Sequence, residues 1–245
     1  MIWRMATPSA EDRHTQYGTP YKWSDYVHKL TSIILSRHEE AKRIVCVNDP
    51  YDTMYSTKDD ERALRVQGKA HVPNTYMKLG DPFPSAGAFK SMLCSSSNKR
   101  PLQAMICSYL TDVAPQIIYS VGSHCTNLST QQQMQYYSFD QSEAATILFS
   151  IYGLLRESGC SDPVVIDAAD TDAYVSAAVI LQQVSGKLCI KRKAGMVSCK
   201  DMVTDEMADC IIQLHCMTGC DANSGFYGKG KMSLYAKVAK SHIAR

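Results

Sequence analysis

One part of the chain constrains its fold more than any other: an apolar run, a group of acids and an amphipathic stretch follow one another in the C-terminal half. Residues 163–166 have the composition of a short buried strand, and residues 173–183 have helical spacing. Between them lie Asp167, Asp170 and Asp172. A strand that leads into a helix predicts a parallel sheet, and the acids then lie at the sheet edge where α/β proteins bind ligands.

Acids held this close together repel one another. Two like charges ~4 Å apart cost about 4 kcal/mol at an effective dielectric constant near 20. A proton, a basic partner or a divalent cation can offset that cost. Further acids occur in similar settings: Asp49 ends an apolar run, Glu143 opens a helical pattern and Asp221 follows one. A single acid in such a place is usually a helix cap, but several on alternating strands and helices favour a cation site on one rim.

The rest of the chain continues this alternation. Helices are predicted over residues 24–43, 56–67, 88–94, 101–110, 140–157, 173–183, 204–217 and 232–241, and strands over residues 44–49, 116–122, 163–166 and 188–190. Residues 71–87 are predicted to form a loop, the Gln-rich residues 129–137 an exposed linker, and Gly195 a turn. The pattern predicts an α/β fold with a central, mostly parallel sheet flanked by helices. We expect one domain over residues 24–245, preceded by an N-terminal extension or remnant over residues 1–23.

Composition narrows the class of protein only slightly. The chain has 245 residues, of which 45% are hydrophobic and 20% charged, so a hydrophobic core is expected. Its net charge of +2 excludes no class of partner, because a basic surface can be local. The start of the chain is polar and resembles no secretory signal, so the ten cysteines are predicted to be reduced thiols of a nuclear or cytoplasmic protein. No apolar run approaches the ~20 residues of a membrane span, so no membrane partner is expected.

The spacing of the acids resembles a known family. An Asp-x-Asp after a buried strand, then Gly219-Cys220-Asp221 ahead of a Gly-x-Gly loop and a helix, is similar to the PIN-like and flap-endonuclease-like nuclease superfamily. Within it, the whole chain is most similar to a branch of animal proteins, some of them transposon-associated. The stretches that carry the resemblance are residues 47–52, 142–146, 169–172, 215–221 and 225–231.

The resemblance implies a three-layer domain that cleaves nucleic-acid phosphodiester bonds with two Mg²⁺ or Mn²⁺ ions. It assigns a metal-binding, catalytic role to acids at five positions of this chain. Asp49 matches the acid after the second core strand of the family, and Glu143 the first acid of its Glu-x-acid helix. Asp170 and Asp172 match its paired aspartates, and Asp221 the aspartate of its Gly-Cys-Asp motif.

The chain departs from the pattern of this family at two points, and these leave a second hypothesis for its function. Position 145, where active relatives often carry another acid, is Ala145, and no segment before Ser24 resembles the first core strand of the family. The alternative is therefore an inactive nuclease-fold module that binds nucleic acid or protein. A phosphohydrolase that uses the same acids on another substrate is a third reading, which no motif supports.

Basic residues predict where phosphates bind. Lys58, Arg62 and Arg65 form one stripe if their segment is helical, although a solvated charged helix has the same spacing. Lys229 and Lys231 stand in a glycine-rich loop before a helix, a setting that suits a phosphate but also an ordinary turn. Nucleic acid is the expected partner, with DNA and RNA both open.

A zinc site is the remaining chemistry to weigh. His215, Cys216 and Cys220 lie close together near the end of a helical pattern. No paired Cys-x2-Cys accompanies them, so structural side chains are favoured over zinc ligands.

Overall fold

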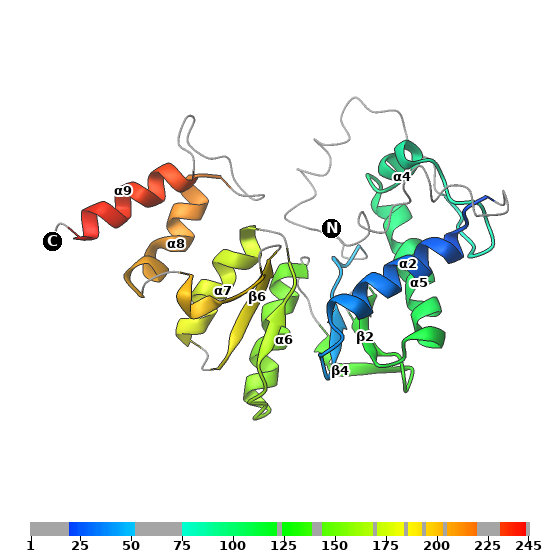
Figure 1. Ribbon diagram of the computed structural model, residues 1–245, viewed down its shortest axis with the longest axis horizontal. Helices are drawn as coiled ribbons and strands as arrows, with labels where there is room; N and C mark the ends of the chain where they lie inside the picture. The colour runs from blue at the N-terminus through cyan, green and yellow to red at the C-terminus, as the bar shows by residue number, and fades with distance from the viewer. Residues whose placement is uncertain are drawn as a thin grey trace. The chain divides into compact units, whose positions relative to one another are not determined.

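The computed structural model describes residues 20–51, 75–121, 124–138, 144–168, 171–183, 186–192, 195–202, 205–219 and 231–243, and it shows a mixed α/β chain (Figure 1). Contacts divide the chain into two compact units, Met1–Ala144 and Ala145–Arg245, and each is treated by itself below. Within the described ranges, no helix has both the length and the apolar character that crossing a membrane requires.

The N-terminal unit contains three described helices and a four-stranded sheet. The helices are α2 (Trp23–Arg37), α4 (Ala86–Met92) and α5 (Ser96–Val113), and the strands are β1 (Ile44–Cys46), β2 (Ile117–Val121), β3 (His124–Asn127) and β4 (Gln132–Ser138). The strands are ordered β1-β2-β3-β4. β1 and β2 run parallel, whereas the β2–β3 and β3–β4 pairs are antiparallel. The sheet is therefore mixed.

The core of this unit forms because α2 and α5 each present an apolar stripe. In α5, Leu102, Ile106 and Leu110 recur at the four-residue spacing of one helix face, and none is exposed to solvent. Burial of each such side chain stabilises the fold by roughly 1.5–3 kcal/mol. A second part of the core is aromatic: neighbouring rings lie with their centroids between 4.7 and 5.9 Å apart, in a cluster of Tyr21, Trp23, Tyr26, Phe83 and Phe89.

The C-terminal unit begins at Ala145, in the first turn of α6 (Ala144–Glu157). Its described elements are β5 (Val164–Ile166), α7 (Thr171–Gln183), β6 (Leu188–Arg192), β7 (Gly195–Ser198), the 3₁₀ helix η1 (Cys199–Asp201), α8 (Asp205–Met217) and α9 (Lys231–Ile243). The sheet order is β5-β6-β7, with β5 and β6 parallel and β6 and β7 antiparallel. The segment β5–α7–β6 is thus a β-α-β unit, as the sequence predicts.

One face of this sheet carries the core of the C-terminal unit. Ile166, Leu188 and Ile190 alternate with more exposed residues along β5 and β6, and they pack with Phe149 and Tyr152 of α6. Strand alternation places residues two apart on the same face, which is why these three meet. The same face receives Ala177 of α7.

The predicted α/β class is confirmed, and so are most helices, with ends shifted by a few residues. The largest shift is in the first helix, which ends at Arg37 rather than at residue 43, while the strand predicted to reach Asp49 ends at Cys46. The exposed linker predicted over residues 129–137 is wrong, because β4 occupies most of it and pairs with β3. Gly195, predicted to mark a turn, begins β7.

Other predictions about the fold remain predictions. The described strands form two small mixed sheets, so a single central, mostly parallel sheet and a PIN-like domain over residues 24–245 are not established by them. The predicted helix over residues 56–67 and residues 1–19 lie outside the described ranges.

Candidate functional site

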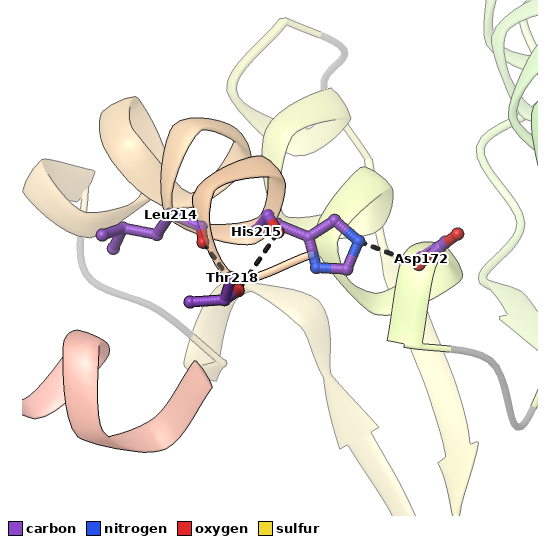
Figure 2. A network of polar contacts seen from close by, with 4 residues as sticks. All are labelled: Asp172, Leu214, His215 and Thr218. Atoms are coloured by element: carbon purple, nitrogen blue, oxygen red, sulfur yellow. Dashed lines mark hydrogen bonds and ion pairs between the residues drawn. The ribbon is translucent and has the colours of Figure 1, made fainter. Parts of the chain in front are cut away.

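A partly buried hydrogen bond joins two helices of the C-terminal unit (Figure 2). Asp172 lies in the first turn of α7, and His215 lies in the last turn of α8. Nε2 of His215 is 2.8 Å from Oδ1 of Asp172, and the two side chains are 9% and 27% exposed. An ionised carboxylate only accepts hydrogen bonds, so Nε2 is the ring nitrogen that carries the proton. The bond therefore ties the beginning of α7 to the end of α8.

The end of α8 is fixed by the residues that follow His215. The Thr218 hydroxyl donates to the carbonyl oxygens of Leu214 (2.8 Å) and His215 (3.1 Å), as Figure 2 shows. Gly219 then takes a left-handed conformation with φ of +92°, which a glycine adopts without steric cost. Helix ends leave carbonyl groups without partners inside the helix. Here the Thr218 hydroxyl reaches the carbonyl of His215, while the backbone N–H groups of Thr218 and Gly219 donate to those of Leu214 and Cys216. The first half of the Thr218-Gly219-Cys220-Asp221 motif is thus a helix stop.

Two more of the predicted acids stand next to this hydrogen bond in the sequence. Asp170 directly precedes Thr171, the first residue of α7, and Asp221 follows Met217, the last residue of α8, by four positions. Both acids lie outside the described residues. The bond between Asp172 and His215 therefore holds together the two helix ends to which these acids are attached in the sequence.

Asp49 has a structural role in the N-terminal unit. Its Oδ1 accepts a hydrogen bond of 2.9 Å from the backbone N–H of Ala144, the first residue of α6. Its Oδ2 lies 3.5 Å from the Tyr51 hydroxyl, and its backbone oxygen accepts a 3.0 Å bond from the buried Gln103 amide. The bond to Ala144 makes Asp49 a helix cap, which is the usual role of a single acid in such a place. Since each carboxylate has about four acceptor positions, capping is compatible with metal binding.

The chain between β1 and Asp49 is held against β2. The backbone N–H of Asn48 donates to the hydroxyl of Ser120 at 2.6 Å, and the Asn48 side-chain amide donates to the Ser120 carbonyl at 3.0 Å. Next to Asp49, the Lys99 ammonium lies 4.8 Å from the centroid of the Tyr51 ring, a cation–π contact. These bonds fix the backbone from which Asp49 projects, at the carboxyl ends of two parallel strands.

Three residues around Asp49 are not among the predicted site residues: Gln103, Ser120 and Lys99. Gln103 carried a signal, because it shares a helical stripe with Ile106 and Leu110 and is a polar residue on an apolar face. Nothing in the sequence marks Ser120 or Lys99 as a site residue, because serine is common in strands and lysine is common in helices.

Most of the predicted site lies beyond the described ranges. Of the five acids, Asp49 and Asp172 are described, and they belong to different units. Outside the described ranges lie Glu143, Asp170, Asp221, Lys58, Arg62, Arg65 and Lys229, and Lys231 is placed only as the first residue of α9. Among the residues with described positions, no three His, Cys, Asp or Glu side chains form a group able to hold a metal ion.

The described cysteines differ in how exposed their thiols are. No disulfide joins any two of the nine cysteines in the described ranges. Cys125 and Cys199 are buried, whereas Cys216, beside His215, is exposed. Burial raises the pKa of the Cys46 and Cys125 thiols to about 12, which keeps both protonated at neutral pH.

Comparison of the chain with protein-family models, curated proteins and solved structures finds no match.

Proposed function

We propose that the chain is a divalent-metal-dependent nuclease of the PIN-like, flap-endonuclease-like type that cleaves phosphodiester bonds of nucleic acid. Asp49, Glu143, Asp170, Asp172 and Asp221 would bind Mg²⁺ or Mn²⁺. The hydrogen bond between Asp172 and His215 carries the proposal, because it joins the helix ends beside which Asp170 and Asp221 stand in the sequence.

The chemistry of the side chains fits such ions. All five are carboxylates, and Mg²⁺ prefers oxygen ligands. When bound, a pair of ions supplies an activated water and stabilises the leaving oxygen. In this proposal Lys58, Arg62, Arg65, Lys229 and Lys231 hold phosphates of the substrate and so position its backbone.

The inactive, nucleic-acid- or protein-binding module remains the alternative, and one observation favours it. Asp49 has a use that needs no metal, because its carboxylate accepts the first backbone N–H of α6. Ala145 then occupies the first turn of that helix, where active relatives often carry an acid. A chain that had lost catalysis would keep Asp49 for this structural reason.

A cleavage assay separates the two functions. Labelled single-stranded, flap and duplex DNA, with RNA counterparts, would be incubated with the full chain and Mn²⁺. We expect cleavage by the wild type and none by the Asp170→Ala/Asp172→Ala variant. A matched control is Glu157→Ala/Asp201→Ala, which removes two exposed acids of the same unit and changes the net charge equally.

Each outcome has a defined meaning. Binding of nucleic acid without cleavage favours the inactive module. Cleavage that survives the Asp170→Ala/Asp172→Ala substitutions contradicts the proposal and points to a contaminating nuclease. Loss of cleavage in the Glu157→Ala/Asp201→Ala control as well shows that charge, rather than metal binding, is responsible.

A further inference from the structure

We infer that His215 is a positioning residue for Asp172: its Nε2–H group fixes the orientation in which the Asp172 carboxylate meets a divalent cation. The inference rests on the proposed function and adds to it a side chain outside the five acids. The contact that motivates it is the 2.8 Å hydrogen bond between the two residues, which lie 43 positions apart in the chain (Figure 2).

The imidazole is suited to this role by where it is held. His215 is 9% exposed, so water competes little for its Nε2–H group. Its helix turn is closed by the Thr218 hydroxyl and by Gly219, which fixes the backbone that carries the ring. Asp172 is three times more exposed, at 27%, so the carboxylate borders both the buried imidazole and the surface.

The type of donor also fits. A carboxylate has about four acceptor positions, so a hydrogen bond from His215 is compatible with a cation on the same group. An imidazole can donate an N–H without carrying a positive charge, whereas a lysine or arginine in its place would repel the metal ion. Hydrogen bonds that orient metal ligands in this way typically change metal affinity by about 10- to 100-fold when they are removed.

A purely structural tie between α7 and α8 predicts something different. If the bond adds only to stability, its loss would lower the free energy of unfolding of the C-terminal unit and leave the metal affinity of the folded chain unchanged. Two measurements therefore discriminate between the roles. Electron paramagnetic resonance of Mn²⁺ gives the metal affinity of the folded chain, and thermal unfolding in a chelator gives the stability without metal.

The variants are chosen as pairs. His215→Leu removes the donor, and Gln213→Leu makes a similar polar-to-Leu change at an exposed position of the same helix. We expect Mn²⁺ affinity to fall by about 10- to 100-fold in His215→Leu and to stay unchanged in Gln213→Leu. His215→Gln and His215→Asn form a second, polar pair if the Leu variant does not fold. The longer glutamine places its amide N–H near the Nε2 position and should retain affinity, whereas the shorter asparagine should not.

The possible results separate this inference from the proposed function. Binding of Mn²⁺ by the wild type with equal affinity in His215→Leu or His215→Asn overturns the positioning role and leaves the nuclease proposal standing. A wild type that binds no Mn²⁺ overturns both. Long-range ¹H–¹⁵N spectra of the metal-free chain give a further check, because a His215 ring protonated at Nδ1 alone would contradict the hydrogen bond itself.

Discussion

Among the six glycines whose surroundings the structure describes, Gly186 has the least room for a side chain. Its φ is +143°, and a Cβ atom there would lie 2.7 Å from Nε of Arg156 and 2.9 Å from the hydroxyl of Tyr152. The Arg156 guanidinium stacks on the Tyr152 ring and donates to the carbonyl oxygens of Asp162 (2.8 Å) and Lys187 (3.3 Å). Gly186 thus permits the contacts that join the end of α6 to the start of β6.

A pair of glycine substitutions tests this. Gly186→Ala should lower the free energy of unfolding by about 1–3 kcal/mol, because the methyl group overpacks against Arg156 in a strained backbone. Gly153→Ala, in the middle of α6 with nothing within 4 Å of the new Cβ, should raise it by about 0.5–1 kcal/mol. Urea unfolding followed by far-ultraviolet circular dichroism measures both, and two changes of the same sign would contradict the assignment.

The partly buried Cys46 thiol predicts a dependence of stability on pH. Its pKa is about 12 in the folded chain against an ordinary value of 9.0. Below about pH 9 the thiol is protonated in both states and contributes no pH dependence. Between about pH 9 and 12 only the unfolded chain loses the proton, so stability falls by up to about 1.4 kcal/mol per pH unit.

Urea midpoints at pH 8 and pH 10, in reducing buffer, would show that fall in the wild type. Cys125 shows the same shift, so Cys46→Ala should reduce the fall without removing it. The exposed Cys216→Ala variant is the matched control and should behave as the wild type. A Cys46→Ala protein with the full pH dependence would show that other groups cause it.

Asp172 and His215 differ in how far the sequence predicts them as residues of the candidate site. Asp172 was predicted because a strand, an acid and a helix follow one another locally in the sequence. Its partner His215 was considered only for zinc, because nothing in the sequence links two residues 43 positions apart. The packing of α7 against α8 makes that contact, and packing partners are not encoded by local spacing.

Helices and strands differ in how well the sequence predicts them, because helices depend on local spacing and strands on partners that are distant in the chain. Helices α6 and α7 were predicted because their apolar residues recur at helical spacing. Strands β3, β4 and β7 were missed. β4 begins with glutamines, so its sequence predicts a linker, although it is hydrogen-bonded to β3. The sequence of β3 has no alternation of polar and apolar residues that would predict a strand.

The contact between Asp49 and α6 gives a prediction at this scale. Asp49→Ala removes the acceptor for the first N–H of α6 and should cost about 0.5–2 kcal/mol of stability in a chelator, whereas Asp49→Asn keeps an acceptor oxygen and should cost little. Thermal unfolding without metal measures both. If the two variants lose the same stability, the hydrogen bond to Ala144 is not what Asp49 contributes. Under the proposed function, both variants also bind Mn²⁺ less tightly than the wild type.

For the whole molecule, the α/β class followed from the sequence, but the partition of strands into sheets did not. Both parallel pairs, β1–β2 and β5–β6, join strands that flank helical sequence, which is the arrangement the alternation predicts. The hairpin strands that complete each sheet add antiparallel neighbours instead. The order of strands depends on tertiary contacts, which is why a central sheet remains a prediction.

Two cores imply two local stabilities. The first core runs from Trp23 to Leu128 in the sequence, and the second from Phe149 to Cys199. Leu102→Ala should destabilise the first by about 2–5 kcal/mol and speed hydrogen exchange in β2, and Leu188→Ala should do the same for β6. Hydrogen-exchange mass spectrometry follows both strands at once. If either substitution speeds exchange equally in both strands, the units unfold as one.

The aromatic cluster has a consequence for how this chain is observed. The only two tryptophans of the sequence are Trp3 and Trp23, and both belong to the N-terminal unit. Trp23 is 2% exposed among the rings around it, so its emission reports the melting of that neighbourhood. The half of the polypeptide that holds Asp172 and His215 contains no tryptophan, so a dye or a tryptophan introduced there would report its unfolding directly.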